Sequence, residues 1–97
     1  MYVVLAQHYA QLDKIPEAQD GILRFGLALR SFNGFIGRHT VIDIKEPSKI
    51  LSITLWRNKN CYDKWQNSET RIGFTERHSY LWTHATERTA YESIDEL

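Results

Sequence analysis

The pattern of apolar and polar residues predicts a β-strand in each of four stretches of the chain. The stretches are residues 2–9, 35–44, 50–56 and 87–94. The first stretch is rich in β-branched and aromatic residues, and the third and the last alternate between apolar and polar positions. In the third stretch, Leu51, Ile53 and Leu55 would share one face, because successive side chains of a strand point to opposite sides of a sheet. Only residues 45–49 separate the second and third stretches, and 45–48 are a turn sequence with a proline, so we expect a hairpin there.

Apolar residues at spacings of three and four predict a first helix that ends near residue 30. Its apolar face is formed by Ile15, Ala18, Ile22, Leu23, Phe25, Leu27 and Leu29. We expect Asp13 to cap the start of this helix, and Asn33 and Gly34 to end it, because both of the latter tolerate a left-handed conformation. Gly21 and Gly26 inside the helix cost up to about 1 kcal/mol each relative to alanine, which indicates close packing against another backbone.

A second helical region follows Asn58, a residue suited to cap a helix. Ser68 interrupts this region and is suited to cap a second helical piece. One face of that piece would carry Phe74, His78, Leu81 and Ala85. The order of elements is then βαββαβ, which is the ferredoxin-like arrangement of an α+β fold. It predicts a four-stranded antiparallel sheet with its helices packed on one face.

Both faces of the predicted sheet are apolar. The strand at residues 2–9 carries Val3 and Leu5 on one face and Val4 and Ala6 on the other. A face that no helix covers and that has this much apolar area needs another protein surface against it. A second copy of the chain would supply that surface, so we expect a homodimer joined through the open sheet face.

Length and charge exclude several classes of partner. The 97 residues suffice for one domain with a limited core. Twelve basic residues balance twelve acidic ones, so neither nucleic acid nor a membrane surface is expected as a partner. No stretch approaches the roughly 20 apolar residues of a spanning helix, and a single cysteine, Cys61, fits a reducing compartment, so we expect a cytoplasmic protein. The four histidines lack close ligand spacing, and the strand register that decides whether His8 and His39 meet is open, so we expect no metal site.

Three phrases of the sequence are similar to those of a known family. They are the opening YVVLAQHY, the FNGF that follows the first helix, and ILSITLWRNKNCYDKWQNSE, in which a strand ends in Trp56 and Trp65 follows nine residues later. In these phrases the chain resembles the antibiotic biosynthesis monooxygenase-like (ABM) proteins of the dimeric α+β barrel superfamily. The resemblance covers nearly the whole chain. It implies a single ABM-like domain over residues 1–97, with a pocket between the helices and the sheet.

The resemblance places Trp65 in the wall of that pocket, where an indole offers a flat apolar surface and one N–H donor. An imidazole at His78 is able to take a proton from a phenol, and Arg71 is able to hold the resulting anion. We therefore expect His78, Trp65 and Arg71 to carry the chemistry. The residues expected to contact the substrate are Trp65, Phe74, Tyr62, Gln7 and His39.

The family resemblance implies a monooxygenase that acts on a small planar aromatic, such as a quinol, without a cofactor. Haem-degrading relatives resemble one another in having a histidine about ten residues after the helix tryptophan and an asparagine in the first strand. Here Thr75 stands ten residues after Trp65, and the first strand offers Gln7 and His8, so a haem site is not carried over. Two alternatives stay open: a non-catalytic small-molecule binding or stress-response protein of the same fold, and a haem-binding or haem-degrading protein.

Overall fold

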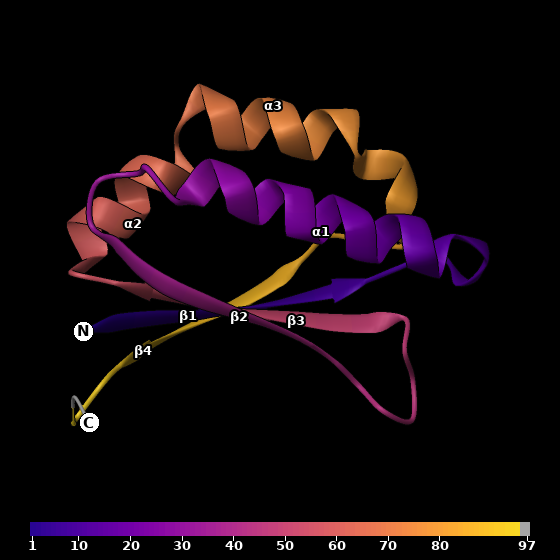
Figure 1. Cartoon of the computed structure of the whole chain (residues 1–97), viewed down its shortest axis with the longest axis horizontal. Helices are drawn as coiled ribbons and strands as arrows, with labels where there is room; N and C mark the ends of the chain where they lie inside the picture. The colour runs from indigo at the N-terminus through magenta and orange to yellow at the C-terminus, as the bar shows by residue number, and fades with distance from the viewer. Residues whose placement is uncertain (96–97) are drawn as a thin grey trace.

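The computed structural model describes residues 1–95, which form one sheet with helices on one of its faces (Figure 1). The elements, in chain order, are β1 (Tyr2–Tyr9), α1 (Ile15–Leu29), β2 (Phe35–Ile42), β3 (Lys49–Trp56), α2 (Lys59–Gln66), α3 (Glu69–Arg77) and β4 (Glu87–Glu92). Short 3-10 turns at Leu12–Lys14 and Ser79–Leu81 precede α1 and follow α3. No helix within residues 1–95 has the length and apolar character needed to cross a membrane.

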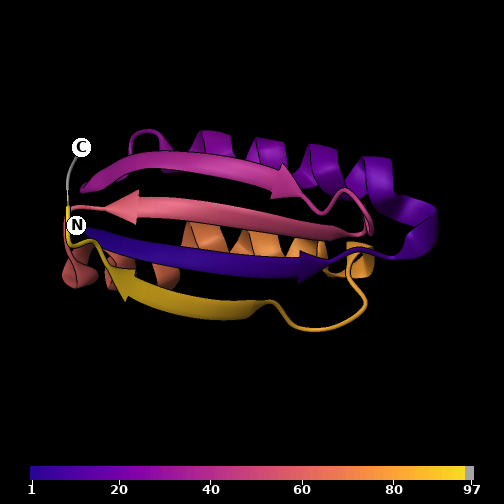
Figure 2. The ribbon, with the colours of Figure 1, turned by 90° about the horizontal axis from the view of Figure 1, so that it is seen from below.

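The strands are ordered β2-β3-β1-β4, and every neighbouring pair is antiparallel. Figure 2 shows this order from the face that carries no helix, with the helices behind the strands. The first strand of the chain is therefore central, and it pairs with both the third and the last. This topology confirms the predicted ferredoxin-like α+β fold with a four-stranded antiparallel sheet.

The register of the sheet decides which of its side chains lie under the helices. Ala6 of β1 is paired with Ser52 of β3 and with Arg88 of β4, and all three line a cavity beneath the helices. Because side chains alternate along a strand, His8 lies on this same side of the sheet. His8 is only 8 % exposed, although it stands on a strand near one end of the sheet.

A β-bulge in β2 changes the alternation of its side chains. The register shifts between Phe35 and Gly37, so the residues beyond the bulge point to the opposite faces from those that strict alternation would give. Arg38 pairs with Thr54 and lines the same cavity beneath the helices as Thr54 does. His39 is the next residue along β2 and consequently lies on the open face of the sheet.

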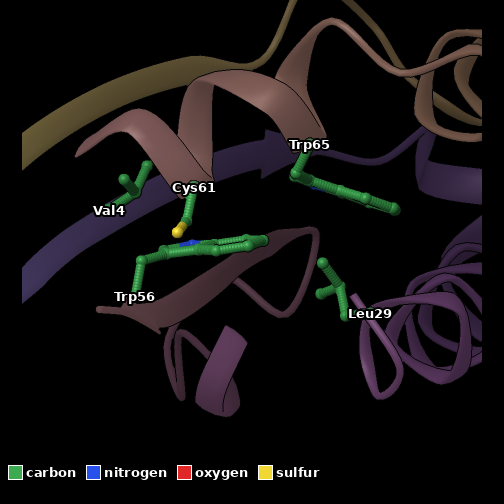
Figure 3. Close-up of a cluster of buried hydrophobic side chains, with 5 residues drawn as sticks. All are labelled: Val4, Leu29, Trp56, Cys61 and Trp65. Atoms are coloured by element: carbon green, nitrogen blue, oxygen red, sulfur yellow. The ribbon is translucent and has the colours of Figure 1, made fainter. Parts of the chain in front are cut away.

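The core lies between the helices and the sheet in two clusters. The first comprises Val4, Leu29, Trp56, Cys61 and Trp65, and the second comprises Ala10, Ala18, Ile22, Ile50 and Leu81. Trp56 is completely buried, and its Nε1 donates a hydrogen bond to Oγ1 of Thr54 at 3.0 Å. Figure 3 shows Cys61 of α2 pointing toward the ring of Trp56. Trp56 is thus a core residue on the helix side of the sheet and does not belong to the open face.

Two of the three predicted N-terminal helix caps are present. The side chain of Asn58 accepts a hydrogen bond from the backbone N–H of Cys61 at 2.9 Å, and Ser68 accepts one from the N–H of Arg71 at 3.2 Å. The predicted cap by Asp13 is wrong. Asp13 lies within the 3-10 turn before α1, and Lys14, at the cap position of α1, makes no side-chain hydrogen bond to the helix backbone.

Three elements are shorter than the sequence pattern predicts. β2 ends at Ile42 and β4 at Glu92, each two residues before the predicted end. α3 ends at Arg77, where the chain changes to a 3-10 turn, so its helical face does not extend to Leu81 and Ala85. Ile44 and Ile94 continue the alternation of apolar residues past the ends of β2 and β4, so the sequence pattern predicts both strands too long.

The apolar face of α1 is narrower than predicted. Leu23 and Leu27 are 61 % and 59 % exposed and do not belong to the core. Gly26 does allow a close approach, but to a side chain instead of a backbone, because a Cβ at this position would overlap Nη1 of Arg38. A Cβ at Gly21 would likewise meet a side chain, that of a core leucine, at 3.1 Å.

Candidate functional site

Two cavities lie between the helices and the sheet, and they share His8, Phe25 and Arg88 as walls. The first cavity is lined by Val4, Ala6, His8, Phe25, Leu29, Arg38, Ser52, Thr54, Tyr62, Trp65, Gln66, Arg71 and Arg88. The second is lined by His8, Gly21, Ile22, Phe25, Phe74, Thr75, His78, Trp82, Thr86 and Arg88. The space open to the centre of a water molecule is only about 50 Å³ and 40 Å³, so both cavities are narrow.

Four aromatic rings form a row that lines both cavities. The Phe74 ring stacks on Phe25 at a centroid distance of 4.6 Å and on His78 at 4.0 Å, with interplanar angles of 18° and 14°. At the other end, Phe25 packs against Trp65 at 5.4 Å. We call Trp65, Phe25, Phe74 and His78 the aromatic row. Because Phe74 is stacked on both faces, it offers its ring edge to the second cavity, and the row as a whole forms an apolar wall.

His78 stands at one end of the aromatic row with one ring nitrogen already hydrogen-bonded. Its Nδ1 lies 2.8 Å from the carbonyl oxygen of Phe74. Because a carbonyl only accepts hydrogen bonds, Nδ1 carries the proton, and in the neutral ring Nε2 keeps its lone pair. A lone pair at Nε2 is what a general base requires.

His8 is the second histidine of the site, and its ring is neutral near pH 7. Burial, followed by the positive charges of Arg88 and Arg38, lowers the pKa of His8 from 6.5 to about 4. Nδ1 of His8 lies 3.1 Å from Oγ1 of Thr86, and its ring packs against Trp82 at 5.3 Å. A buried neutral imidazole has one N–H to offer to an oxygen that becomes negatively charged during a reaction.

Trp65 belongs both to the core and to the wall of the first cavity (Figure 3). It is 4 % exposed and packs edge-on against Phe32 at 5.2 Å. Within residues 1–95 its Nε1 has no hydrogen-bond acceptor, so this donor remains for a ligand. Tyr62 lies on the same helix, donates from its hydroxyl to Gln66 at 3.3 Å, and has its pKa raised by burial, which keeps the phenol protonated.

Three arginines reach the first cavity from three different elements. Arg38 comes from β2, Arg71 from α3 and Arg88 from β4. Burial lowers the pKa of Arg38, while burial followed by the charge of Arg88 lowers the pKa of Arg71. Arginine side chains stay protonated in proteins, so the first cavity carries guanidinium groups.

The residues expected from the sequence to form the site fall into three groups. Trp65, Tyr62 and Arg71 line the first cavity. Phe74 and His78 line the second. Gln7 and His39 alternate with inward-facing neighbours and lie on the open face of the sheet, on the other side from both cavities. The lining residues that sequence reasoning did not select include His8, Phe25, Thr86, Trp82 and Arg88.

The described residues contain no cluster that is suited to a metal ion. Within residues 1–95, no group of three or more His, Cys, Asp or Glu side chains lies in a position to hold one. The chemistry available at the two cavities is therefore that of aromatic walls, two histidines, a phenol and three guanidinium groups.

Comparison with known proteins identifies the family. The model of the antibiotic biosynthesis monooxygenases (ABM) matches residues 1–77. A search of the curated proteins found no match. Among solved structures, a proposed antibiotic biosynthesis monooxygenase from Deinococcus radiodurans has a TM-score of 0.89 at 15% identity, over 100% of this chain and 96% of that one. A proposed antibiotic biosynthesis monooxygenase from Nitrosomonas europaea has a TM-score of 0.87 at 8% identity, over 98% and 100%.

A conserved protein from Methanosarcina mazei is similar as well, with a TM-score of 0.83 at 16% identity, over 93% of this chain and 89% of that one. At such identities the likeness to solved structures shows the fold alone. The family model is the stronger finding, since it matches most of the sequence directly. This chain belongs to the antibiotic biosynthesis monooxygenase family.

Proposed function

We propose that the chain is a monooxygenase that oxygenates a small planar aromatic of the hydroquinone type, without a metal or organic cofactor. The observation that carries the proposal is the aromatic row, which lines both narrow cavities and ends in a histidine whose Nε2 is free to accept a proton. Membership of the monooxygenase family supports the reaction class.

In the proposed reaction, Nε2 of His78 takes the proton of a substrate hydroxyl, and the substrate anion passes an electron to O₂. A carbon–oxygen bond forms, the second oxygen atom leaves as water, and a hydroquinone becomes a hydroxyquinone. One O₂ is consumed for each hydroquinone. The neutral N–H of His8 and the guanidinium of Arg71 stabilise the anion, while Trp65 and Phe74 hold the ring.

The proposed active form is a homodimer joined through the open sheet face. Six apolar side chains alternate toward this face from the three adjacent strands: Val3, Leu5, Val41, Leu51, Ile53 and Leu55. None of them belongs to the two core clusters beneath the helices. A contiguous apolar surface of this kind is favourably covered by the same surface of a second copy.

The function is tested by oxygen uptake with a panel of hydroquinones in chelator-treated buffer. Wild type is expected to consume one O₂ per hydroquinone. His78→Ala is expected to lower kcat by about 100-fold or more, because general-base catalysis contributes roughly 10²- to 10⁴-fold. His84→Ala is the matched control, since this histidine is exposed and lines neither of the two cavities.

Equal uptake by wild type and His78→Ala would refute the role of His78. If none of the hydroquinones supports uptake although they bind, the protein is a binding module of the same fold and not an oxygenase.

A further inference from the structure

The three arginines of the first cavity are opposed by no acidic side chain. Neither the first nor the second cavity has an aspartate or a glutamate among its lining residues. Within residues 1–95, Arg38, Arg71 and Arg88 take part in none of the salt bridges, whereas other surface cations such as Arg24 do. The first cavity therefore concentrates positive charge.

Two of these arginines are held in place by backbone carbonyl groups. Nη2 of Arg38 donates to the carbonyl oxygen of Ile22 at 2.7 Å, and Nε of Arg71 donates to that of Gln66 at 2.8 Å. A guanidinium has five N–H donors, so each arginine is positioned by one bond and keeps further donors. The guanidinium of Arg88 makes no hydrogen bond within the described residues, so all five of its N–H donors remain for a ligand.

Holding these charges together is costly for the unliganded protein. Burial disfavours the charged form of Arg38, and its Nε is a buried donor with no acceptor within residues 1–95. The charge of Arg88 acts on Arg71 and on the buried His8. An anion bound in the first cavity would offset the cost of burying the Arg38 charge, the unpaired Nε donor of Arg38 and the effect of the Arg88 charge on its neighbours.

We propose that the first cavity binds the carboxylate of a planar aromatic acid, whose ring lies along the aromatic row. The choice of an aromatic ring rests on the proposed function, and the acidic group is the new element. A flat carboxylate matches the planar fork of a guanidinium and suits a narrow cavity better than a tetrahedral phosphate. Arg88 lies beyond the residues that the family model matches, so this selectivity involves a part of the chain outside the match.

The proposal is tested with 2-naphthoate and 2-naphthamide, which differ in charge but hardly in shape, and with 2-naphthyl phosphate. Affinities are measured by titration calorimetry on the full chain. We expect 2-naphthoate to bind at least about tenfold more tightly than 2-naphthamide, and Arg88→Gln to remove most of that difference. Arg24→Gln is the matched control, because this exposed arginine pairs with Asp20 and lines neither the first nor the second cavity.

A second measurement follows the imidazole of His8 by NMR, with His8→Gln for assignment. Bound 2-naphthoate should raise the pKa of His8, because its charge opposes those of Arg88 and Arg38, whereas 2-naphthamide should raise it less. This readout reports charge next to His8 and would not respond to a merely structural effect of the Arg88 substitution.

Equal affinities for 2-naphthoate and 2-naphthamide would overturn the proposal, as would tighter binding of 2-naphthyl phosphate than of 2-naphthoate. Loss of affinity for both naphthoate and naphthamide in Arg88→Gln would also overturn it, since that pattern indicates packing and not charge. None of these compounds is a hydroquinone. Charge-selective binding in a protein that fails the oxygen-uptake test would therefore leave this site standing and remove only the proposed reaction.

Discussion

Replacing His8 with glutamine should remove a large part of the acid sensitivity of this protein. Glutamine is similar in size and can still bond to Thr86, but it does not titrate. In the folded chain, His8 is buried between the two cavities, facing Arg88 and Arg38 and sharing the second cavity with His78. Protonation of its ring would place a further positive charge among these groups.

The magnitude follows from the lowered pKa of His8. The folded value of about 4 lies below the 6.5 of the free side chain, so the unfolded chain binds the proton more tightly. The stability contributed by neutral His8 is therefore complete above pH 6.5 and is lost as the pH falls toward 4. The full difference corresponds to about 3 kcal/mol, and about 2 kcal/mol of it is lost between pH 7 and pH 5.

Urea denaturation of wild type and His8→Gln at several pH values between 4 and 7.5 measures this effect. Carboxylates titrate in both proteins, so the difference between the two free energies of unfolding isolates His8. We expect wild type to lose about 2 kcal/mol relative to the variant between pH 7 and pH 5. Parallel pH profiles, or an NMR titration of His8 near pH 6.5, would refute this reasoning.

Three further substitutions test other parts of the structure. Gly34→Ala should lower the free energy of unfolding by about 2 kcal/mol or more, because Gly34 has φ +84° and a Cβ there would overlap Cys61; urea denaturation measures this. Ile53→Lys, on the open face, should convert the proposed dimer to a monomer in light scattering, because it would bury a charge in the proposed subunit contact. Gly26→Ala should displace Arg38 and weaken 2-naphthoate binding, while the unfolding free energy stays within about 1 kcal/mol of wild type.

Gly34→Ala and Ile53→Lys each have a matched control. Gly73→Ala places a Cβ 3.2 Å from the flexible end of Arg77 in α3 and should not destabilise the protein. Ile44→Lys alters an isoleucine that is 92 % exposed and lies outside the strands, so it should leave the dimer intact. An unchanged mass for Ile53→Lys would contradict the proposed subunit contact, and unchanged naphthoate affinity for Gly26→Ala would contradict the role of Arg38.

Local signals explain the parts of the fold that were predictable. The caps at Asn58 and Ser68 depend on a hydrogen bond to a residue three positions later, so the sequence alone reveals them. The alternation of residues 2–9 and 50–56 likewise depends only on neighbours in the chain. Asp13 fails as a cap because an additional 3-10 turn precedes α1, and nothing in the local composition separates the two kinds of turn.

The parts of the site that were not predictable depend on pairing between distant strands. Whether His8 faces the helices is decided by its register with β3, more than 40 residues later, and its partner Thr86 comes later still. The bulge between Phe35 and Gly37 has a similar effect in β2. Strict alternation from Phe35 would have turned His39 toward the cavities, whereas one extra residue turns Arg38 there instead.

The central position of β1 has a consequence for folding during synthesis. Among the four strands, β1 leaves the ribosome before the others, yet one of its two neighbours is β4, which is made after the other three. Until β4 has been made, β1 is an edge strand with a row of unpaired backbone groups, which is a surface prone to wrong pairing. Thr86 and Arg88 also arrive with this last segment, so His8 acquires its surroundings only in the final step. A nascent chain that pauses before β4 thus has neither the complete four-stranded sheet nor the complete site.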